Sequence, residues 1–340
     1  MRGLALTYDD IQLVPEFSSI TSRKNIYLNT LVSRNHRIDM PLIASPMDTV
    51  CGLDMAKKMG QMGGVGCVHR FMSKEDQAQI IKNLKSFFEQ NNIQSPTMAA
   101  IGVGEEGKER AHALVNAGID ILVIDVAHGH HENVLLMLGW LKSRFPKVDV
   151  IAGNIATEEG ALDLEEAGAD GLRVGIGGGS LCTTRVKTGF GIPNVTCLEE
   201  ISKVAKTPIM ADGGIKSSGD IAKALAVGAQ CVMIGSLIAG TDESPGKILE
   251  TTNGLYKRYR GSASLETKST HGQEERNVEG ESTTIPYKGG VKFVVEGLLD
   301  GVRSALSYAG ASNLDEYHPA YVQVTNSGAR EAQPHLIQSK

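Results

Sequence analysis

The segment ALVNAGIDILVID (residues 113–125) decides the fold of this chain. It contains, in order, the end of an amphipathic helix, the glycine at position 118 that ends this helix, and a buried strand whose last residue is Asp125. The same order recurs in ALDLEEAGADGLRV (161–174) and AKALAVGAQCVMIG (222–235). Repeated units of this kind predict parallel strands connected by helices, and therefore an α/β fold.

Working outward from these units, we count eight of them. The predicted strands are 41–45, 64–68, 98–102, 120–125, 149–153, 170–174, 208–212 and 230–235. The predicted helices are about 52–60, 73–90, 105–117, 131–145, 157–167, 196–205, 218–227 and 291–308. Eight βα units close into a (β/α)8 TIM barrel, whose chemistry lies on the loops after the strands.

Four segments extend the simplest barrel within one predicted domain over 1–340. Residues 1–40 form an N-terminal extension, and a glycine-rich catalytic loop at 175–194 follows the sixth strand. Residues 251–290, after the eighth strand, are rich in Gly, Ser, Thr and charge and have weak periodicity, which predicts a mobile flap insertion. A C-terminal tail covers about 312–340.

Composition excludes several classes of function. The 340 residues hold 34 Lys and Arg against 39 Asp and Glu, a net charge of −5, so we expect neither a nucleic-acid partner nor a membrane surface. No uninterrupted apolar run reaches the roughly 18 residues of a membrane helix. The five cysteines contain no C-x-x-C pair, which favours a reducing, cytoplasmic location.

Two motifs allow alternative interpretations. Gly102 to Gly107 match the G-x-G-x-x-G dinucleotide fingerprint, but Glu105 and Glu106 would set carboxylates beside a pyrophosphate, so a tight barrel turn fits better. The segment 125–132 (DVAHGHHE) has side chains that suit a transition metal, although no second histidine motif supports a metal site. A barrel also uses such polar loops to contact a ribose or a base.

The glycine-rich loop carries a more specific signal. In GIGGGSLCTTR (175–185), four glycines within five residues let backbone groups converge on an ion, and Cys182 lies among hydroxyls near Arg185. This setting favours a thiolate, so we interpret Cys182 as a nucleophile. The other four cysteines are interpreted as small buried apolar residues: Cys51, Cys67, Cys197 and Cys231.

The seventh and eighth strands end in ADGGI (211–215) and IGS (234–236), where TIM barrels often bind a phosphate. Together with Ser180 these ends predict a phosphate cradle, and Asp212 is placed to accept hydrogen bonds from ribose hydroxyls. A phosphorylated ligand follows from this arrangement, and both FMN and a mononucleotide satisfy it.

With these residues in place, the chain resembles the IMP dehydrogenase/GMP reductase family along nearly its whole length. The motifs that carry the resemblance are SPMDTV (45–50), AHG (127–129), GIGGGSLCTTR (175–185), TGFG (188–191), ADGGI (211–215), MIGS (233–236), SPG (244–246), YRGSAS (259–264), VEG (278–280), PYKG (286–289) and SYAGA (307–311).

The resemblance implies a purine nucleotide substrate and a nicotinamide cofactor. It makes Cys182 the nucleophile that attacks the purine C2, with Thr184 and Glu279 handling protons at the leaving or attacking group. It assigns nucleotide contacts to Ser45, Met47, Ser180, Asp212, Gly213, Gly214, Gly235, Ser236, Tyr259 and Gly261. It assigns cofactor contacts to Arg70, Asp125, Ala127 and His128.

The flap distinguishes the branches of the family. The dehydrogenase branch uses a flap Arg-Tyr pair to activate water, whereas here Arg276 is followed by Asn277. The regulatory CBS module usual in that branch after the second strand is absent, because Val68 leads almost directly to Ser73. We therefore expect the reductase branch, which converts GMP to IMP and ammonia with NADPH. The alternatives are a dehydrogenase without the module that uses NAD and, more remotely, an FMN- or metal-dependent barrel enzyme.

The tail SGAREAQPH (327–335) is similar to the dehydrogenase tail. By this resemblance, the carbonyls of Gly177, Gly179 and Cys182 bind a monovalent cation such as K⁺, and Glu331 of a neighbouring subunit completes the site. The same feature predicts a homotetramer.

Overall fold

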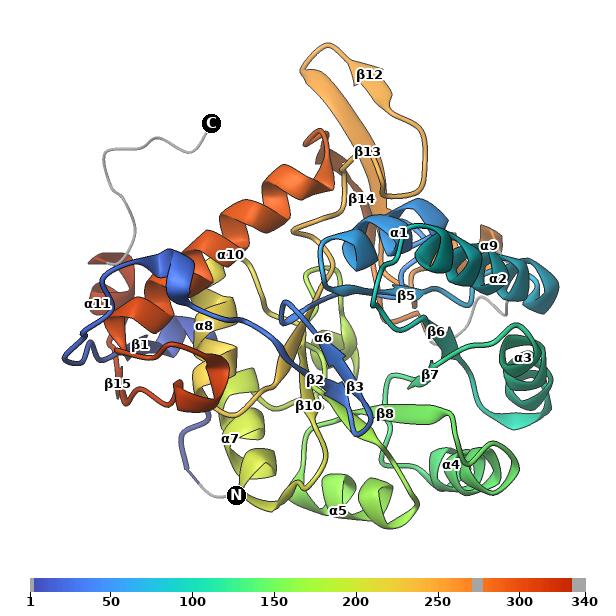
Figure 1. Ribbon diagram of the computed structural model, residues 1–340, viewed down its shortest axis with the longest axis horizontal. Helices are drawn as coiled ribbons and strands as arrows, with labels where there is room; N and C mark the ends of the chain where they lie inside the picture. Colours follow the sequence, from blue (N-terminus) through green and yellow to red (C-terminus); the bar gives the residue numbers. More distant parts are fainter. Residues whose placement is uncertain (1–2, 271–277, 332–340) are drawn as a thin grey trace.

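The computed structural model describes residues 3–270 and 278–331, and its centre is a closed barrel of eight parallel strands (Figure 1). The strands are β4 (Leu42–Ala44), β5 (Val65–Val68), β6 (Met98–Ile101), β7 (Ile121–Asp125), β8 (Asp149–Ile155), β9 (Gly171–Val174), β10 (Ile209–Asp212) and β11 (Cys231–Ile234). Neighbours pair in parallel and β11 closes onto β4. The predicted TIM barrel is confirmed.

Helices follow the strands at the predicted places. They are α1 (Leu53–Gln61), α2 (Lys74–Gln90), α3 (Gly104–Asn116), α4 (Glu132–Arg144), α5 (Glu158–Glu166), α7 (Asn194–Val204), α8 (Ser218–Ala226) and α10 (Val291–Tyr308). Their starts have the expected chemistry: the Ser73 hydroxyl accepts a hydrogen bond from the Asp76 amide at 3.0 Å. The glycines at 118, 168 and 228 all have positive φ, as helix-ending residues require.

A hairpin closes the N-terminal end of the barrel. Strands β2 (Thr30–Ser33) and β3 (His36–Ile38) send Val32 and Ile38 into the apolar cluster that fills the barrel interior. The Asp149 carboxylate, at the start of β8, accepts hydrogen bonds from the Ser33 hydroxyl at 2.6 Å and the Asn35 amide at 3.0 Å. Because this end is filled by side chains, space for a ligand remains at the opposite end.

The N-terminal extension and the C-terminal tail are paired with each other. Strand β1 (Ile11–Leu13) runs antiparallel to β15 (Tyr321–Gln323), and the short helices η1 (Tyr8–Asp10) and α11 (Asn326–Glu331) are in contact. The extension also includes η2 (Arg23–Asn25), and η3 (Leu314–Glu316) follows α10. Both extensions are therefore built onto the outside of the barrel.

The flap is more regular than its weak periodicity predicted. It begins with a three-stranded antiparallel sheet of β12 (Leu249–Thr251), β13 (Gly254–Arg260) and β14 (Ser282–Pro286), which projects from the barrel in Figure 1. A short helix, α9 (Leu265–Thr270), follows β13. The strands lack a strong apolar alternation because much of the sheet is exposed, and β13 pairs with β14 across more than twenty residues of chain.

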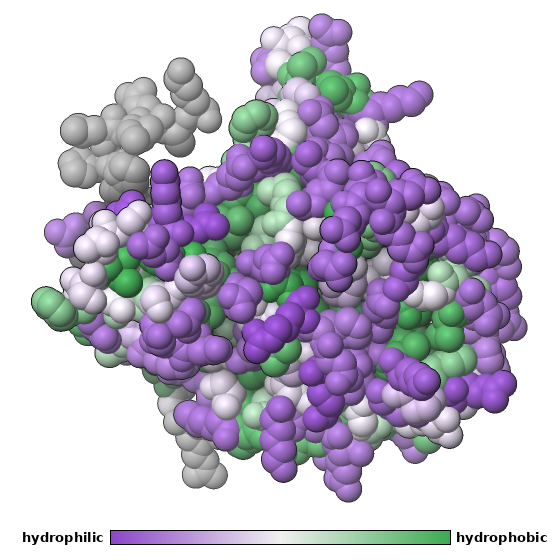
Figure 2. Space-filling view, in the orientation of Figure 1, coloured by the Kyte–Doolittle hydropathy of each residue, from purple (hydrophilic) through white to green (hydrophobic). Residues whose placement is uncertain are grey.

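The outer surface is largely hydrophilic in the view of Figure 2, with hydrophobic side chains also visible on the protruding sheet. In the part of the chain that the structure describes, no helix has both the length and the apolar character needed to cross a membrane.

Candidate active site

A cavity of about 520 Å³ lies at the C-terminal ends of the barrel strands, between the glycine-rich loop and the flap. Among the residues expected from the sequence, its lining includes Ser45, Met47, Arg70, Asp125, Ala127, Gly177, Gly179, Ser180, Cys182, Thr184, Asp212, Gly213, Tyr259, Gly261 and Glu279. It does not include His128, Gly214, Gly235, Ser236 or Glu331. Segments far apart in the chain thus converge where a TIM barrel performs its chemistry.

The cysteine, the threonine and the flap carboxylate form a hydrogen-bonded chain. The Cys182 thiol donates to the Thr184 hydroxyl at 3.2 Å, and that hydroxyl donates to Glu279 Oε2 at 2.6 Å. Thr184 is only 9 % exposed and begins the short helix α6 (Thr184–Thr188). Such a chain can move a proton between the reacting centre at the sulfur and the flap carboxylate.

Backbone pairing aligns the flap carboxylate with the loop. The Thr183 amide donates to the Glu279 carbonyl at 3.0 Å, and the Glu281 amide donates to the Leu181 carbonyl at 3.0 Å. The loop and the returning flap strand therefore form a short antiparallel bridge between Cys182 and Gly280. This bridge sets the Glu279 side chain over Thr184.

Arg185 has a different role from the one expected. Its guanidinium donates to the Ile176 carbonyl at 3.0 and 3.1 Å and to the Ile192 carbonyl at 2.8 Å. The side chain thus braces the two ends of the glycine-rich loop, while the polar contact of the Cys182 sulfur is the Thr184 hydroxyl. Gly177 must remain a glycine because it has φ +76° and a Cβ there would lie 2.5 Å from the Arg185 side chain.

The predicted phosphate cradle is assembled around Tyr259. The Tyr259 hydroxyl lies 2.9 Å from the Ser180 hydroxyl, and burial raises the pKa of Tyr259 while hydrogen bonds with Ser180 and Ser236 oppose that shift. A Cβ on Gly235 would lie 3.3 Å from the Met47 sulfur and 3.4 Å from the Tyr259 hydroxyl. Gly235 and Ser236 therefore border the cavity although they do not line it.

An arginine that the sequence analysis did not single out connects the ribose and cofactor walls. Arg173, 6 % exposed at the end of β9, pairs with Asp125 at 2.5 Å and with Asp212 at 2.9 Å. Asn154 donates to Asp212 Oδ2 at 2.7 Å. The signal was a charged residue within the otherwise apolar strand GLRV (171–174). Arg173 orients both carboxylates toward the same cavity.

The ion pairs keep this network charged despite its burial. Burial acts to raise the pKa of Asp125, but the guanidinium groups of Arg173 and Arg70 lower it below its ordinary value. Burial likewise acts to lower the pKa of Arg173, and Asp212 and Asp125 raise it instead. Asp125 is thus an anion that can accept hydrogen bonds from a bound ligand.

The cofactor wall carries an unpaired donor. Arg70 Nη2 donates to the Asp125 carbonyl at 3.3 Å, and Arg70 Nε lies 3.6 Å from the Asp125 carboxylate, beyond hydrogen-bond distance. Within the described residues this buried Nε has no hydrogen-bond partner. Arg70, Asp125 and Ala127 therefore line the cavity together, and Asp125 supplies an anion there.

The histidines after β7 do not form a metal site. His128 is exposed outside the cavity lining, His130 contacts Asp163 at 2.7 Å, and the His131 ring accepts from the Asn133 amide to cap α4. In the described ranges, no group of three or more His, Cys, Asp or Glu side chains is arranged to hold a metal. The expected contact of His128 with a cofactor is not tested by these contacts.

The G-x-G-x-x-G segment is a barrel turn. Gly104 begins α3 with φ +75°, and Gly107 packs so tightly on Gly102 that a Cβ there would lie 2.5 Å from the Gly102 carbonyl oxygen. The Glu106 carboxylate pairs with Arg110 at 2.6 Å. Because the sheet is a closed barrel, the alternative of a Rossmann dinucleotide fold is wrong.

The remaining cysteines are structural. Cys51, Cys67, Cys197 and Cys231 are all buried, as expected, and burial raises the pKa of Cys197 to about 12. Burial also raises the thiol pKa values of Cys51, Cys67 and Cys231. Cys182 is the more exposed cysteine, and it faces the cavity.

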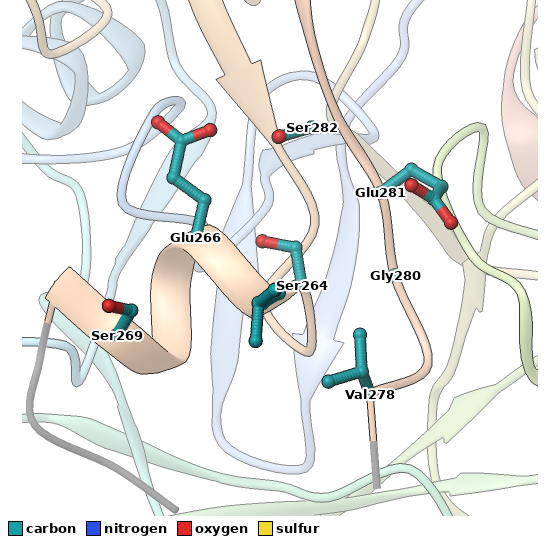
Figure 3. Close-up of a pocket in the computed structure, with 8 residues that line it drawn as sticks. Ser264, Glu266, Ser269, Val278, Gly280, Glu281 and Ser282 are labelled. Atoms are coloured by element: carbon teal, nitrogen blue, oxygen red, sulfur yellow. The ribbon is translucent and has the colours of Figure 1, made fainter. Parts of the chain in front are cut away.

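A second cavity of about 530 Å³ adjoins the first at Gly280 (Figure 3). Ser264, Glu266 and Ser269 lie on its α9 side, and Val278, Glu281 and Ser282 lie on the returning strand. Glu266 is paired with Arg260 at 3.3 Å, and Arg260 also pairs with Asp48 at 2.6 Å beside Met47. Ion pairs thus anchor the flap helix to the wall of the first cavity.

The carbonyls expected to bind a cation belong to the glycine-rich loop. The Gly179 carbonyl accepts a hydrogen bond from the Cys182 amide at 3.0 Å, and the buried Thr183 hydroxyl of the same loop has no partner among the described residues. Glu331 is exposed at the end of α11. The contact expected from a neighbouring subunit's Glu331 stays a prediction.

Comparison with known proteins gives the same assignment as the motifs. A family model described as IMP dehydrogenase / GMP reductase domain matches residues 5–335. An inosine-5'-monophosphate dehydrogenase of Cryptosporidium parvum is 40 % identical over 388 aligned positions, which cover 99 % of this chain and 96 % of the relative. A GMP reductase of Leishmania major is 31 % identical and covers 98 % of this chain and 97 % of its own length.

Solved structures include a similar molecule. A variant of GMP reductase from Trypanosoma brucei, in complex with guanosine 5'-monophosphate, superposes with a TM-score of 0.93 at 29 % sequence identity. The match covers 99 % of both chains. The chain with this barrel and this cavity therefore belongs to the IMP dehydrogenase/GMP reductase family of oxidoreductases.

Proposed function

We propose that this chain is a GMP reductase, which converts GMP to IMP and ammonia with NADPH. The observation that carries the proposal is the Cys182–Thr184–Glu279 chain, which pairs a nucleophile with a proton relay through the flap. Between Gly261 and Glu279, the flap sequence contains no Arg-Tyr dipeptide that would serve as a separate base for water. The relay therefore suits protonation of a departing amine better than activation of a water molecule for hydrolysis.

GMP occupies the cavity with its phosphate at Ser45, Ser180, Gly214, Ser236 and Tyr259, its ribose at Asp212 and its base between Met47 and Gly261. Cys182 sulfur bonds to the purine C2, and the 2-amino group leaves as ammonia. The Cys182 thiol proton passes through Thr184 and Glu279 to the departing nitrogen, which completes neutral ammonia. In the second half of the reaction C2 receives a hydride and the C2–sulfur bond breaks, which releases IMP and a Cys182 thiolate that takes up a proton from solvent to restore the thiol.

The cofactor wall fits a nicotinamide nucleotide because the Asp125 carboxylate, which stays charged beside Arg173 and Arg70, is available for hydroxyl donors. NADPH bound there supplies the hydride that C2 receives. Arg173 holds the Asp125 and Asp212 carboxylates, so it keeps the two ligand walls at a constant separation. The flap strand over Thr184 excludes water from the reacting carbon.

IMP dehydrogenase, with NAD as cofactor, is the second candidate. It is favoured by the 40 % identity to the Cryptosporidium parvum dehydrogenase, which exceeds the 31 % identity to the Leishmania major reductase. The dehydrogenase-like tail around Glu331 supports it as well. In this case another group than an Arg-Tyr pair would have to activate water.

Nicotinamide absorbance with purified protein distinguishes the two reactions. One cuvette holds GMP and NADPH, and the other holds IMP, NAD and potassium. We expect NADPH consumption with GMP, no NADH formation with IMP, and no turnover of either pair by Cys182→Ala. NADH formation with IMP alone would contradict the proposal and assign the dehydrogenase reaction.

A further inference from the structure

Among the described residues, the cavity lining offers no positive charge that is free for a phosphate. Its charged lining consists of Arg70, Arg173, Asp125, Asp212 and Glu279, so three carboxylates outnumber two guanidinium groups. Both guanidinium groups are already paired with Asp125, and Arg173 is paired with Asp212 as well. A 5′-phosphate dianion in this cavity therefore needs a positive charge from behind its wall.

Lys288, in the PYKG segment just after β14, lies directly behind the cradle. Its Nζ donates to the Ser236 carbonyl at 2.6 Å and to the Leu237 carbonyl at 3.0 Å. Its amide donates to the Gly240 carbonyl at 2.9 Å. Ser236 is a predicted phosphate contact. The ammonium group therefore binds the backbone of a residue that would itself contact the phosphate.

The ammonium group acts on that loop through its peptide bonds. The Ser236 carbonyl belongs to the same peptide unit as the Leu237 amide, so a cation at the oxygen makes this amide a stronger donor. Within the described residues, neither the Ser236 nor the Leu237 amide donates to another backbone carbonyl. Lys288 therefore both places a positive charge near the cradle and polarises its amides toward an anion.

Among the described residues, no carboxylate is paired with Lys288. Burial lowers the pKa of Lys288 to about 8, and no nearby charge contributes to that shift. Around it, Asp242 accepts from the Tyr287 hydroxyl, Glu243 accepts from the Val291 amide, and Lys257 donates to the Thr241 and Ser244 carbonyls. Asp242 and Glu243 act to raise the pKa of Lys257, whereas burial is the cause of the shift in the pKa of Lys288.

We propose that Lys288 supplies the positive charge for the nucleotide phosphate and so makes the cavity select a phosphorylated purine over the free nucleoside. The inference rests on the proposed nucleotide site. It makes Lys288 a positioning and specificity residue, which acts through the 236–237 loop and does not touch the reacting atoms.

The first experiment compares Lys288→Met with Lys257→Met, a matched removal of a buried lysine that also holds two carbonyls. At about pH 7.5, calorimetric GMP affinity of Lys288→Met should fall about 10- to 100-fold, while guanosine inhibition of turnover changes less than about threefold. In Lys257→Met, GMP affinity and guanosine inhibition should change by the same factor. Equal losses for GMP and guanosine in Lys288→Met, or no loss, would overturn the proposal.

The second experiment uses the wild-type protein, so it holds even where a variant does not fold. At about pH 8.5 a phosphomonoester is already a dianion because its second pKa is about 6. The phosphate raises the pKa of Lys288, so GMP binding should take up as much as roughly three quarters of a proton. Calorimetry in two buffers of different ionisation enthalpy measures this uptake.

The outcomes separate the two levels of inference. GMP binding without proton uptake at about pH 8.5 would overturn the role of Lys288 and leave the proposed function intact. A wild-type protein that does not bind GMP at all would overturn both.

Discussion

At the scale of single residues, the chemistry depends on the short hydrogen-bonded chain between the loop and the flap. Thr184 and Glu279 meet at 2.6 Å, and Thr184 lies 3.2 Å from the Cys182 sulfur. We expect Thr184→Ala and Glu279→Gln each to lower kcat about 10²- to 10⁴-fold while GMP affinity changes only severalfold, because a proton relay acts in the transition state. Steady-state kinetics together with calorimetry measure both quantities.

Glu281→Gln is the matched control, since Glu281 is an exposed carboxylate two residues further along the same strand and outside the first cavity. It should retain nearly normal turnover. Unchanged kcat in both Thr184→Ala and Glu279→Gln would contradict the relay.

At the scale of elements, the β2–β3 hairpin closes the barrel through one buried carboxylate. The Asp149 side chain is 2 % exposed; burial acts to raise its pKa, but hydrogen bonds from His36, Ser33 and Asn35 outweigh that effect and lower the pKa far below its ordinary value. A carboxyl group whose pKa is lowered on folding stabilises the fold above its unfolded pKa of about 3.9. That stability is lost as the pH falls toward the folded pKa.

We therefore expect Asp149→Asn to lower the free energy of unfolding by about 1–3 kcal/mol at neutral pH. The difference from wild type should shrink as the pH drops below about 4, because the Asp149 carboxyl of the unfolded chain then takes up a proton while the folded one is still ionised. Urea denaturation as a function of pH measures this, with Asp39→Asn, an exposed carboxylate just after the hairpin, as the control. A difference that is independent of pH would show that charge on Asp149 does not matter.

At the scale of the whole molecule, large apolar side chains are exposed on the catalytic loop and the extensions. Phe17 is 92 % exposed, Val186 86 % and Phe190 77 %. Exposed apolar side chains that gather in one patch indicate an interaction surface, and Val186 and Phe190 are near neighbours on one loop. We propose the homotetramer expected from the sequence, in which a neighbouring copy contributes Glu331 to a potassium site at the Gly177 and Gly179 carbonyls.

Light scattering should then give a mass about four times 36.3 kDa. Turnover should rise with K⁺ and not with Li⁺, and Glu331→Gln should weaken the response to K⁺ without changing the mass. A fully active monomer that is indifferent to K⁺ would contradict both parts of this proposal.

The sequence by itself determined the barrel, because each βα unit is local. The helix periodicity, the glycines at 118, 168 and 228 and the apolar strands of each unit lie close together along the chain, and each predicted unit appears in the structure. Cys182, Thr184 and Glu279 were also singled out by their positions in sequence motifs. The distances between them come only from the structure.

Only the tertiary structure decided which charged and polar groups from distant parts of the chain contact one another. From β9, Arg173 joins Asp125 of β7 to Asp212 of β10. Arg185 braces its loop instead of the thiol, and Lys288 holds carbonyls that lie far away along the chain. The flap sheet is likewise formed by strands that pair across a long insertion. Hydrogen bonds and ion pairs depend on distances in space, and a periodic pattern along the chain records only which face of an element is buried.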